Sequence, residues 1–203
     1  MKKFFMVTPQ QPEGMLKSQH YFATGNSLLE YGTTCFPIIP VINAYLGQDE
    51  EANLVTVTYD SEHCRRNLGM LRDEVELLCE KKGAKVAIDS VEVPFDDGVS
   101  AIVHVFQELI NRTDDEDGLF ACITFGSKPM PLALVMALQY AYRIKSNVVI
   151  ECVVYGQIDR SGNKPTARIY DVTALVQLDE IVRLLAERGV VDPESALKQI
   201  VGA

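Results

Sequence analysis

Residues 118–144 read GLFACITFGSKPMPLALVMALQYAYRI, and this stretch decides the fold. It joins a short apolar run, a tight loop over Thr124–Pro129 and a long apolar segment that begins with proline. A short apolar run bounded by a loop is typical of a buried strand, and proline suits the first position of a helix. The stretch therefore predicts a strand–loop–helix unit, and in α/β domains the loop of such a unit is where phosphate groups are held.

The rest of the chain repeats this alternation of apolar runs and amphipathic segments. The predicted strands are Phe4–Thr8, Leu54–Tyr59, Lys85–Val93, Leu119–Thr124, Asn147–Tyr155 and Ala167–Tyr170. The predicted helices are Cys35–Leu46, one capped by Ser61 and ended by Gly83, one over 99–110, one from Pro129, Leu175–Glu187 and Pro193–Val201. The long polar connection Gln10–Thr34 has room for short helical turns at Ser18–Ala23 and Leu28–Tyr31.

Repeated strand–helix units predict an α/β fold. We expect a Rossmann-like, mostly parallel six-stranded sheet with helices on both faces, an antiparallel last strand and two C-terminal helices. The expected strand order is 3-2-1-4-5, with the sixth strand at the edge. The chain then divides into a main domain over residues 1–173 and a C-terminal helical element over residues 174–203.

Composition and charge narrow the class of protein. A formal net charge of −9 argues against general binding to nucleic acid or to an anionic membrane, because both need a basic face. The five scattered cysteines lack metal-binding spacing and indicate reduced thiols. The apolar run at the N-terminus is too short for a signal peptide, and the ~15 apolar residues after Pro129 fall short of the ~20 that span a bilayer. We therefore expect a cytoplasmic protein without a membrane segment.

The expected strand order also predicts where a ligand binds. Between strands one and four the order reverses, and α/β sheets bind ligands beyond the carboxyl ends of such strands. These ends are Thr8 and Thr124. The loops that follow these two residues, with the helix starts behind them, are the first candidates for a site.

The first turns of the predicted helices differ in charge. Acidic side chains favour this position because unbonded N–H groups and the helix dipole make it positive. Glu62, Asp96–Asp97 and Glu194 follow this rule in three helices. The helices after Thr33–Thr34 and after Ser127 have no acid there, and the second carries Lys128. This pattern favours a bound anion at these two helix starts.

The loop Gly126-Ser127-Lys128 has the groups that a phosphate site needs. Glycine allows close approach of the backbone, serine can donate a hydrogen bond and lysine adds a positive charge. Plain helix capping is the competing interpretation of the same residues, and it is the preferred one for Thr33–Thr34.

The predicted ligand-binding residues come from the two loops and the segments that flank them. They are Thr8, Pro9, Gln10, Thr33, Thr34, Thr124, Phe125, Gly126, Ser127, Lys128, Met130 and Tyr155. For Met130 and Tyr155, core packing is the competing interpretation.

Other motifs are weaker. The sequence has no G-x-G-x-x-G and no G-x-x-x-x-G-K-[ST], so neither a dinucleotide fingerprint nor a P-loop is supported. His20, His63 and His104 are isolated, and the acidic run Asp114–Asp117 is expected to face solvent. We therefore expect no metal and no cofactor, and the sequence assigns no catalytic residue.

Three segments together resemble one protein family. They are ITFGSKPMPLALVMALQYAYRI at 123–144, VVIECVVYG at 148–156 and IYDVTALVQLDEIVRLL at 169–185, with FPIIPVINAYL at 36–46 in addition. They are similar to the CARF family, the CRISPR-associated Rossmann-fold domains that sense cyclic oligoadenylates made by type III CRISPR complexes. The resemblance covers most of the chain. This chain departs from the family pattern at two points. The family often has an acid and a histidine at the start of the turn, where this chain has Cys122–Phe125. The family also often has an arginine where this chain has Lys128.

The resemblance implies a homodimer whose ligand loops face one symmetric ring of adenylates, a cyclic tetra- or hexa-adenylate, in antiviral signalling. It assigns Thr124, Gly126, Ser127 and Lys128 to the phosphate or ribose loop, with Thr8 and Gln10 in the first-strand loop. Residues 174–203 would then serve in dimerisation, as a linker to an effector or as part of a partner-binding module. No duplex nucleic acid is expected as a partner.

Two alternatives stay open. Some members of the family cleave their own ring by aligning a ribose 2'-hydroxyl with the next phosphate, and Lys128, Ser127 and Thr8 could stabilise that transition state without a metal. No motif of a separate effector nuclease is apparent in the sequence. The other alternative sets the family aside and predicts a Rossmann-like domain that binds a simple nucleotide.

Overall fold

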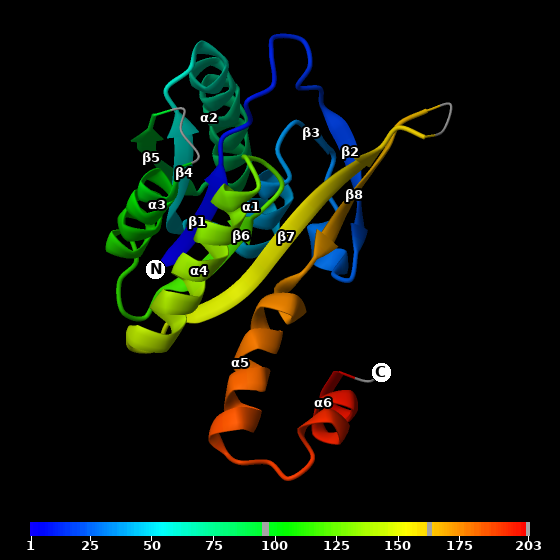
Figure 1. Ribbon diagram of the computed structural model, residues 1–203. Helices are drawn as coiled ribbons and strands as arrows, with labels where there is room; N and C mark the ends of the chain where they lie inside the picture. The colour runs from blue at the N-terminus through cyan, green and yellow to red at the C-terminus, as the bar shows by residue number, and fades with distance from the viewer. Residues whose placement is uncertain (95–97, 162–163, 202–203) are drawn as a thin grey trace.

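The computed structural model describes residues 1–94, 98–161 and 164–201. One eight-stranded sheet has the strand order β3-β2-β8-β7-β6-β1-β4-β5 (Figure 1). The strands are β1 Lys2–Val7, β2 Gln19–Thr24, β3 Thr33–Thr34, β4 Glu51–Tyr59, β5 Lys85–Val93, β6 Gly118–Cys122, β7 Val149–Asp159 and β8 Thr166–Asp171. The helices are α1 Ile38–Tyr45, α2 Glu62–Lys82, α3 Val99–Asn111, α4 Pro129–Ile144, α5 Thr173–Glu187 and α6 Pro193–Val201, with a 3-10 turn η1 at Ser27–Leu29.

Five consecutive strands of the sheet, from β7 to the edge strand β5, are parallel. β1 pairs with β4 on one side and with β6 on the other, while β4 continues to β5 and β6 to β7. Numbered as predicted from the sequence, this is the order 3-2-1-4-5. The Rossmann-like α/β prediction is confirmed, and β8 runs antiparallel to β7 as expected for the last strand.

The sheet has eight strands rather than six, because the connection after β1 contains two of them. β2 forms where the sequence left room for a helical turn, and it pairs in parallel with β8. β3 pairs antiparallel with β2. The expectation that the last strand lies at the edge is therefore wrong, since β8 is covered on both sides by β7 and β2.

β7 is longer than predicted. It continues past Tyr155 to Asp159. The sequence predicts a linker over Gly156–Pro165, with a turn signal at Ser161-Gly162-Asn163, and the first part of this linker is therefore strand. β6 ends opposite Val154, and beyond that point β7 pairs with β8 as a ribbon that extends past the end of β6 (Figure 1). Gly162 and Asn163, which the sequence predicts to form a turn, lie outside the described residues.

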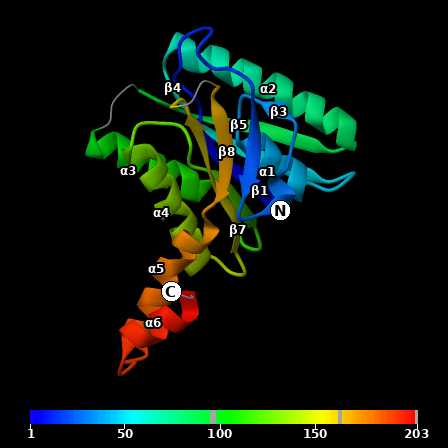
Figure 2. The same cartoon turned by 90° about the vertical axis from the view of Figure 1, so that its right-hand side faces the viewer.

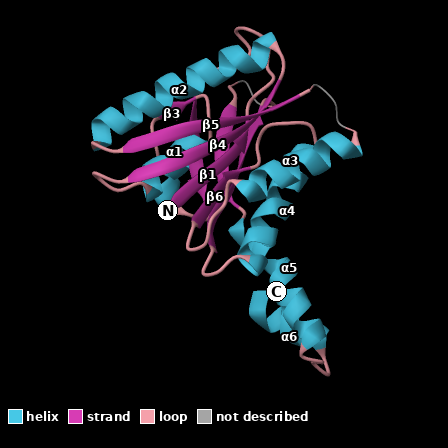
Figure 3. Cartoon of the chain, turned by 90° about the vertical axis from the view of Figure 1, so that its left-hand side faces the viewer, coloured by secondary structure: helices cyan, strands magenta, loops and turns pink. Residues whose placement is uncertain are grey.

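Two hydrophobic clusters fill the space between the sheet and its helices. Alternate side chains of a strand point to opposite faces, so each strand contributes to both clusters. Phe4, Met6 and Leu54 belong to the cluster beneath α1 and α2. Phe5 and Val7 belong to the cluster beneath α3 and α4. Figure 2 shows the sheet between these two helical layers, and Figure 3 shows the same layers from the opposite side.

Local capping sets the bounds of α2. Ser61 accepts a hydrogen bond from the N–H of Cys64 at the start, and Gly83 ends the helix in the left-handed conformation with φ 67°. Its apolar face follows helical spacing in the sequence and is buried, with the residues Cys64, Leu68, Leu71, Val75 and Leu78.

The expectation that Asp114–Asp117 faces solvent is wrong for Asp117, which is 2% exposed. Its carboxylate lies 3.0 Å from the ammonium of Lys3 and 3.1 Å from the N-terminal amine of Met1. Lys3 is itself 5% exposed and also donates to the carbonyl oxygen of Arg112 at 2.6 Å. This buried ion pair joins the start of β1 to the loop before β6.

α5 and α6 project from the end of the sheet opposite to the loop after β1 (Figure 1). Gln139 of α4 donates to the carbonyl oxygen of Val176 at 3.2 Å, and Arg143 of α4 pairs with Glu180 at 3.0 Å. These contacts attach α5 to α4, and a separate role for residues 174–203 stays a prediction. Within the described ranges, none of the helices combines the length and the apolar character needed to cross a membrane.

Candidate functional site

The loop between β6 and α4 packs directly on the end of β1. Gly126 has φ +101°, which side chains of L-residues rarely allow. A Cβ atom at this position would lie 2.9 Å from Cγ1 of Val7 and 3.2 Å from Cβ of Met130. Glycine is therefore needed both for the backbone conformation and for the close approach of β1.

Thr124 and Gly156 attach the same loop to β7. The hydroxyl of Thr124 accepts a hydrogen bond of 2.7 Å from the N–H of Gly156 and lies 3.1 Å from Sγ of Cys122. A Cβ atom on Gly156 would lie 2.5 Å from Cγ of Pro37, so this glycine also allows the segment before α1 to approach β7. The predicted loop is thus brought together with β1, β7 and the start of α1.

Ser127 and Lys128 have different surroundings. Ser127 Oγ lies 3.0 Å from the hydroxyl of Tyr59 at the end of β4. Lys128 occupies the N-cap position of α4 and makes no side-chain capping hydrogen bond. Its side chain is exposed and forms no ion pair with the residues that the structure describes. Lys128 is therefore a cation at the surface, at the point where β1, β4 and β6 end.

The first turn of α4 offers few donors to an anion. Pro129 and Pro131 have no N–H, and the N–H of Met130 already donates to the carbonyl oxygen of Ser127 at 3.0 Å. An anion at this helix start would therefore depend on the ammonium of Lys128 more than on helical N–H groups.

The loop after β1 is held in place by buried polar contacts. Thr8 is 0% exposed, and its hydroxyl lies 2.9 Å from that of Thr58, which in turn accepts from Ser90 at 2.9 Å. Asn67 of α2 donates to the carbonyl oxygen of Pro9 at 2.9 Å. Thr8 and Pro9 are buried, whereas Gln10 is partly exposed. In this conformation Gln10 is the residue of the three that can reach a ligand.

Thr33 and Thr34 form β3 rather than a helix cap. Thr34 is 1% exposed; its hydroxyl accepts from the N–H of Phe36 at 2.9 Å and donates to the carboxylate of Glu74. α1 begins at Ile38, after Pro37, and not at Cys35. Thr33 is exposed, so it is the member of this pair that remains at the surface.

The other predicted residues divide between core and surface. Met130 is 0% exposed and belongs to the core beneath α4, and Phe125 packs against both clusters. Tyr155 is 40% exposed, on the face of β7 opposite to the buried Gly156. Of the predicted residues, the structure exposes Thr33, Gly126, Lys128 and Tyr155, partly exposes Gln10, Thr124, Phe125 and Ser127, and buries Thr8, Pro9, Thr34 and Met130.

In the structure, more helices lack an acidic residue in the first turn than the sequence predicts. α1, α3, α4 and α5 all begin without an acid in the first turn, and Glu62 of α2 and Glu194 of α6 are the acids found there. α3 begins after Gly98, and Asp96 and Asp97 lie outside the described residues. The absence of an acid therefore does not single out α1 and α4, whereas Lys128 at the N-cap does distinguish α4.

The Asp171-x-Thr173 segment of the resemblance is a structural junction. Asp171 accepts from the N–H and hydroxyl of Thr173 at 3.0 and 2.5 Å, and from the amide of Asn26 at 2.9 Å. Thr173 in turn accepts from the N–H of Val153 at 2.8 Å. The segment therefore joins the start of η1, β7 and the start of α5.

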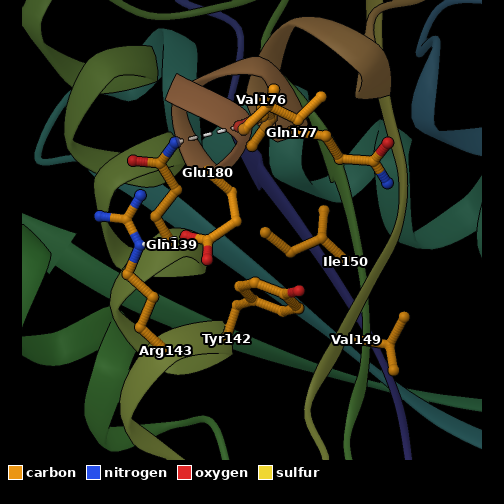
Figure 4. A pocket seen from close by; sticks show the side chains of 9 residues that line it. Gln139, Tyr142, Arg143, Val149, Ile150, Val176, Gln177 and Glu180 are labelled. Carbon is orange, nitrogen blue, oxygen red and sulfur yellow. Dashed lines mark hydrogen bonds and ion pairs between the residues drawn. The ribbon is translucent and has the colours of Figure 1, made fainter. Parts of the chain in front are cut away.

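A cavity of about 290 Å³ lies away from these loops, between α4, β7 and α5 (Figure 4). Its walls combine apolar side chains with the Arg143–Glu180 ion pair. Val149 and Ile150 on its wall stand at the beginning of β7, so the cavity is at the opposite end of the parallel strands from Lys128.

Models of known protein families give no match to this chain. A search of curated proteins also gives no match. Function is therefore inferred from the candidate site and from the residues that carry the resemblance.

Proposed function

We propose that this chain is a cytoplasmic sensor domain of the CARF type, which binds a cyclic tetra- or hexa-adenylate across a homodimer in type III CRISPR signalling. The observation that carries the proposal is the position of Lys128. It is an exposed cation at the carboxyl ends of β1, β4 and β6, on a loop that Gly126 holds against β1. In a chain of net charge −9, such a residue supports a local site for an anion.

An exposed stripe along α4 supports the dimer. Leu132, Met136 and Tyr140 follow one another at helical spacing and are 61%, 51% and 38% exposed. Val103 of α3 is 47% exposed, and the ring of Phe106 on the same helix contacts that of Tyr140 with centroids 5.8 Å apart. A twofold axis that runs along this stripe brings two Lys128 loops to the same end of the dimer.

Such an arrangement fits the symmetry of a ring. Each protomer supplies one Lys128, one Gln10 and one Tyr155, and a cyclic ligand presents equivalent phosphates and bases to both halves. The dimer then forms a site that neither protomer has alone.

The proposal is tested by isothermal titration of the unmodified protein with cyclic tri-, tetra- and hexa-adenylate. We expect heat of binding with the tetra- or hexa-adenylate and a stoichiometry of one ring per two chains. Light scattering on the same sample should give the mass of a dimer. Absence of binding by all three rings at micromolar concentration would rule the proposal out.

A ring nuclease is the second candidate function, and the contact between Tyr59 and Ser127 favours considering it. Their hydroxyls lie 3.0 Å apart, and Ser127 directly precedes Lys128. These polar groups could stabilise the charge that develops in an in-line attack on a phosphate. Incubation of the protein with ring and a chelator, followed by chromatography, separates the functions: linear adenylates indicate a nuclease, and an intact ring indicates a pure sensor.

A further inference from the structure

The loop after β1 is fixed to α2 through its carbonyl oxygens. The amide of Asn67, which is 0% exposed, donates to the carbonyl oxygen of Pro9 at 2.9 Å and to that of Gln11 at 3.0 Å. Arg66 donates to the same oxygen of Gln11 at 2.9 Å and to Oδ1 of Asn67 at 2.9 Å. Side chains of α2 therefore hold the backbone of this loop, which lies beside α2 in Figure 1.

The side chain of Gln11 has no such support. Its Oε1 atom is buried without a hydrogen-bond partner, and it is the only side-chain nitrogen or oxygen in that state among the residues that the structure describes. Its Nε2 atom also makes no hydrogen bond with the described residues. A buried acceptor without a donor has given up its bonds to water for nothing, and such atoms are rare in folded proteins. Hydrogen bonding within the described chain therefore does not account for a glutamine at this position.

Gln11 belongs to the same edge of the sheet as Lys128. β1 ends at Val7, and α2, which holds the loop after it, begins soon after the end of β4. Tyr59, the last residue of β4, has its hydroxyl 3.0 Å from that of Ser127, which directly precedes Lys128. The loop after β1, the start of α2 and the Lys128 loop thus share the carboxyl ends of the parallel strands. Gln11 as a whole is partly exposed there.

The carboxamide of a glutamine matches one edge of adenine. Its oxygen accepts from the exocyclic N6 amine while its nitrogen donates to the ring nitrogen N7, which gives a two-point contact. The side chain of Gln11 can turn toward a base without breaking a hydrogen bond to the described residues, because neither end of its amide makes one. The N6 amine then supplies the donor that Oε1 lacks. Hypoxanthine has an oxygen in place of this amine, so it sets an acceptor against Oε1.

We infer that Gln11 is the residue that selects adenine in the ring, with one Gln11 from each protomer. This inference rests on the proposed sensor function and adds to it the group that distinguishes the bases, at a residue to which the resemblance gives no role. Contacts to phosphates position a nucleic acid without regard to sequence, whereas contacts to base edges specify it. Lys128 then provides affinity for any such ring, and Gln11 provides the preference for adenylate.

The inference is tested by isothermal titration with cyclic tetra- and hexa-adenylate and with the matching cyclic inosinates, in which hypoxanthine replaces adenine. The unmodified protein should prefer the adenylate ring at least about tenfold, because two copies of Gln11 act on each ring. Gln11→Met keeps the length of the side chain and removes the amide. This variant should bind the adenylate ring at least about fivefold more weakly and should distinguish the two rings by less than about twofold.

Two further measurements separate a contact with the base from a role in shaping the loop. A change in loop shape weakens both rings by the same factor and leaves the preference intact, whereas loss of a base contact removes the preference. The unfolding temperature of the ligand-free protein should not fall in Gln11→Met, because the side chain has no hydrogen bond to the described residues to lose. Gln48→Met, at an exposed glutamine before β4, is the matched control and should bind both rings as the unmodified protein does.

Three outcomes overturn the inference while the sensor proposal stands. The unmodified protein binds adenylate and inosinate rings equally, Gln11→Met binds as the unmodified protein does, or Gln11→Met weakens both rings by the same factor. In each of these the unmodified protein still binds a ring. Absence of binding to every ring by the unmodified protein is a different result, and it overturns the sensor proposal together with the role of Gln11.

Discussion

The hydroxyl of Thr124 accepts a hydrogen bond of 2.7 Å from the backbone N–H of Gly156, and this contact joins two of the segments that carry the resemblance. Pro37, in a third such segment, lies where a side chain on Gly156 would be. The Thr-x-Gly turn, the Tyr-Gly pair of β7 and the Phe-Pro before α1 therefore occur together because they pack on one another. Part of the resemblance thus reflects packing, and the proposed function rests on Lys128.

Replacing Gly156 by alanine tests this packing. The new methyl group would lie 2.5 Å from Cγ of Pro37 and 3.2 Å from the hydroxyl of Thr124, so we expect a loss of about 2–3 kcal/mol in the free energy of unfolding. Gly118→Ala in β6 is the matched control, because its nearest neighbour would be 3.6 Å away. Urea unfolding followed by circular dichroism measures both. Equal stability of the two variants would contradict the assigned role of Gly156.

Gly126→Ala tests the support of the ligand loop by β1. We expect it to lower the free energy of unfolding by about 3 kcal/mol, because the positive φ and the overlap with Val7 act together. Gly189→Ala shares a positive φ of 59° but has nothing within 4 Å, so it should cost only about 1 kcal/mol. A cost at Gly126 no larger than at Gly189 would show that β1 does not constrain the loop.

The five parallel strands from β7 to β5 were predictable from the sequence, whereas β2 was not. Buried runs such as Phe4–Thr8 reveal a parallel strand by themselves, because both faces are apolar. Gln19–Thr24 has alternating burial with Phe22 exposed, and its partner β8 is far away in the chain. Such non-local pairing leaves no local signal, so both the eight-strand sheet and the inner position of β8 appear only in the structure.

The buried ion pair between Lys3 and Asp117 is expected to matter for stability. Asp117→Asn should lower the free energy of unfolding by about 3 kcal/mol, because it leaves the ammonium of Lys3 poorly compensated. Asp114 also pairs with Lys3, at 2.6 Å, but its side chain is 79% exposed, so Asp114→Asn should change stability by less than about 1 kcal/mol. Thermal unfolding of both variants checks this, and a reversed order would contradict it.

Acid should remove the contribution of Asp114. The hydrogen bond from Lys3 and its positive charge lower the pKa of this carboxyl in the folded protein. A lowered folded pKa means that the contribution is fully present above the ordinary aspartate pKa and is lost as pH falls through the folded value. We therefore expect the stability difference between the unmodified protein and Asp114→Asn to shrink below about pH 4. A constant difference down to acidic pH would refute this.

Three buried thiols should be unreactive in the folded protein. Burial raises the pKa of Cys35 and of Cys122 to about 11 and that of Cys152 to about 12, so all three are protonated at neutral pH. We expect slow alkylation of these residues at pH 8 by mass spectrometry and rapid alkylation in guanidinium. Fast labelling of any of the three in the native protein would contradict the packing described here.

The position of the candidate loops was predictable from the sequence, whereas the surroundings of their side chains were not. The strand order correctly brings the loops after β1 and β6 together, and Gly126 and Lys128 occupy the expected places. The sequence does not show that the hydroxyls of Thr8 and Thr34 are taken by Thr58 and by Glu74, since these partners come from β4 and α2. Nor does it show that α3 and α5 also start without an acid.

The central claim is that Lys128 holds an anionic ring, and titration of Lys128 variants with the tetra- and hexa-adenylate tests it most directly. Lys128→Ala should weaken binding at least about tenfold, because a hydrogen bond to a charged group is lost in each protomer. Lys128→Arg should retain most of the affinity, and Lys81→Ala, at an exposed lysine of α2, should bind as the unmodified protein does. If Lys128→Ala binds the ring as tightly as the unmodified protein, Lys128 does not hold the ring.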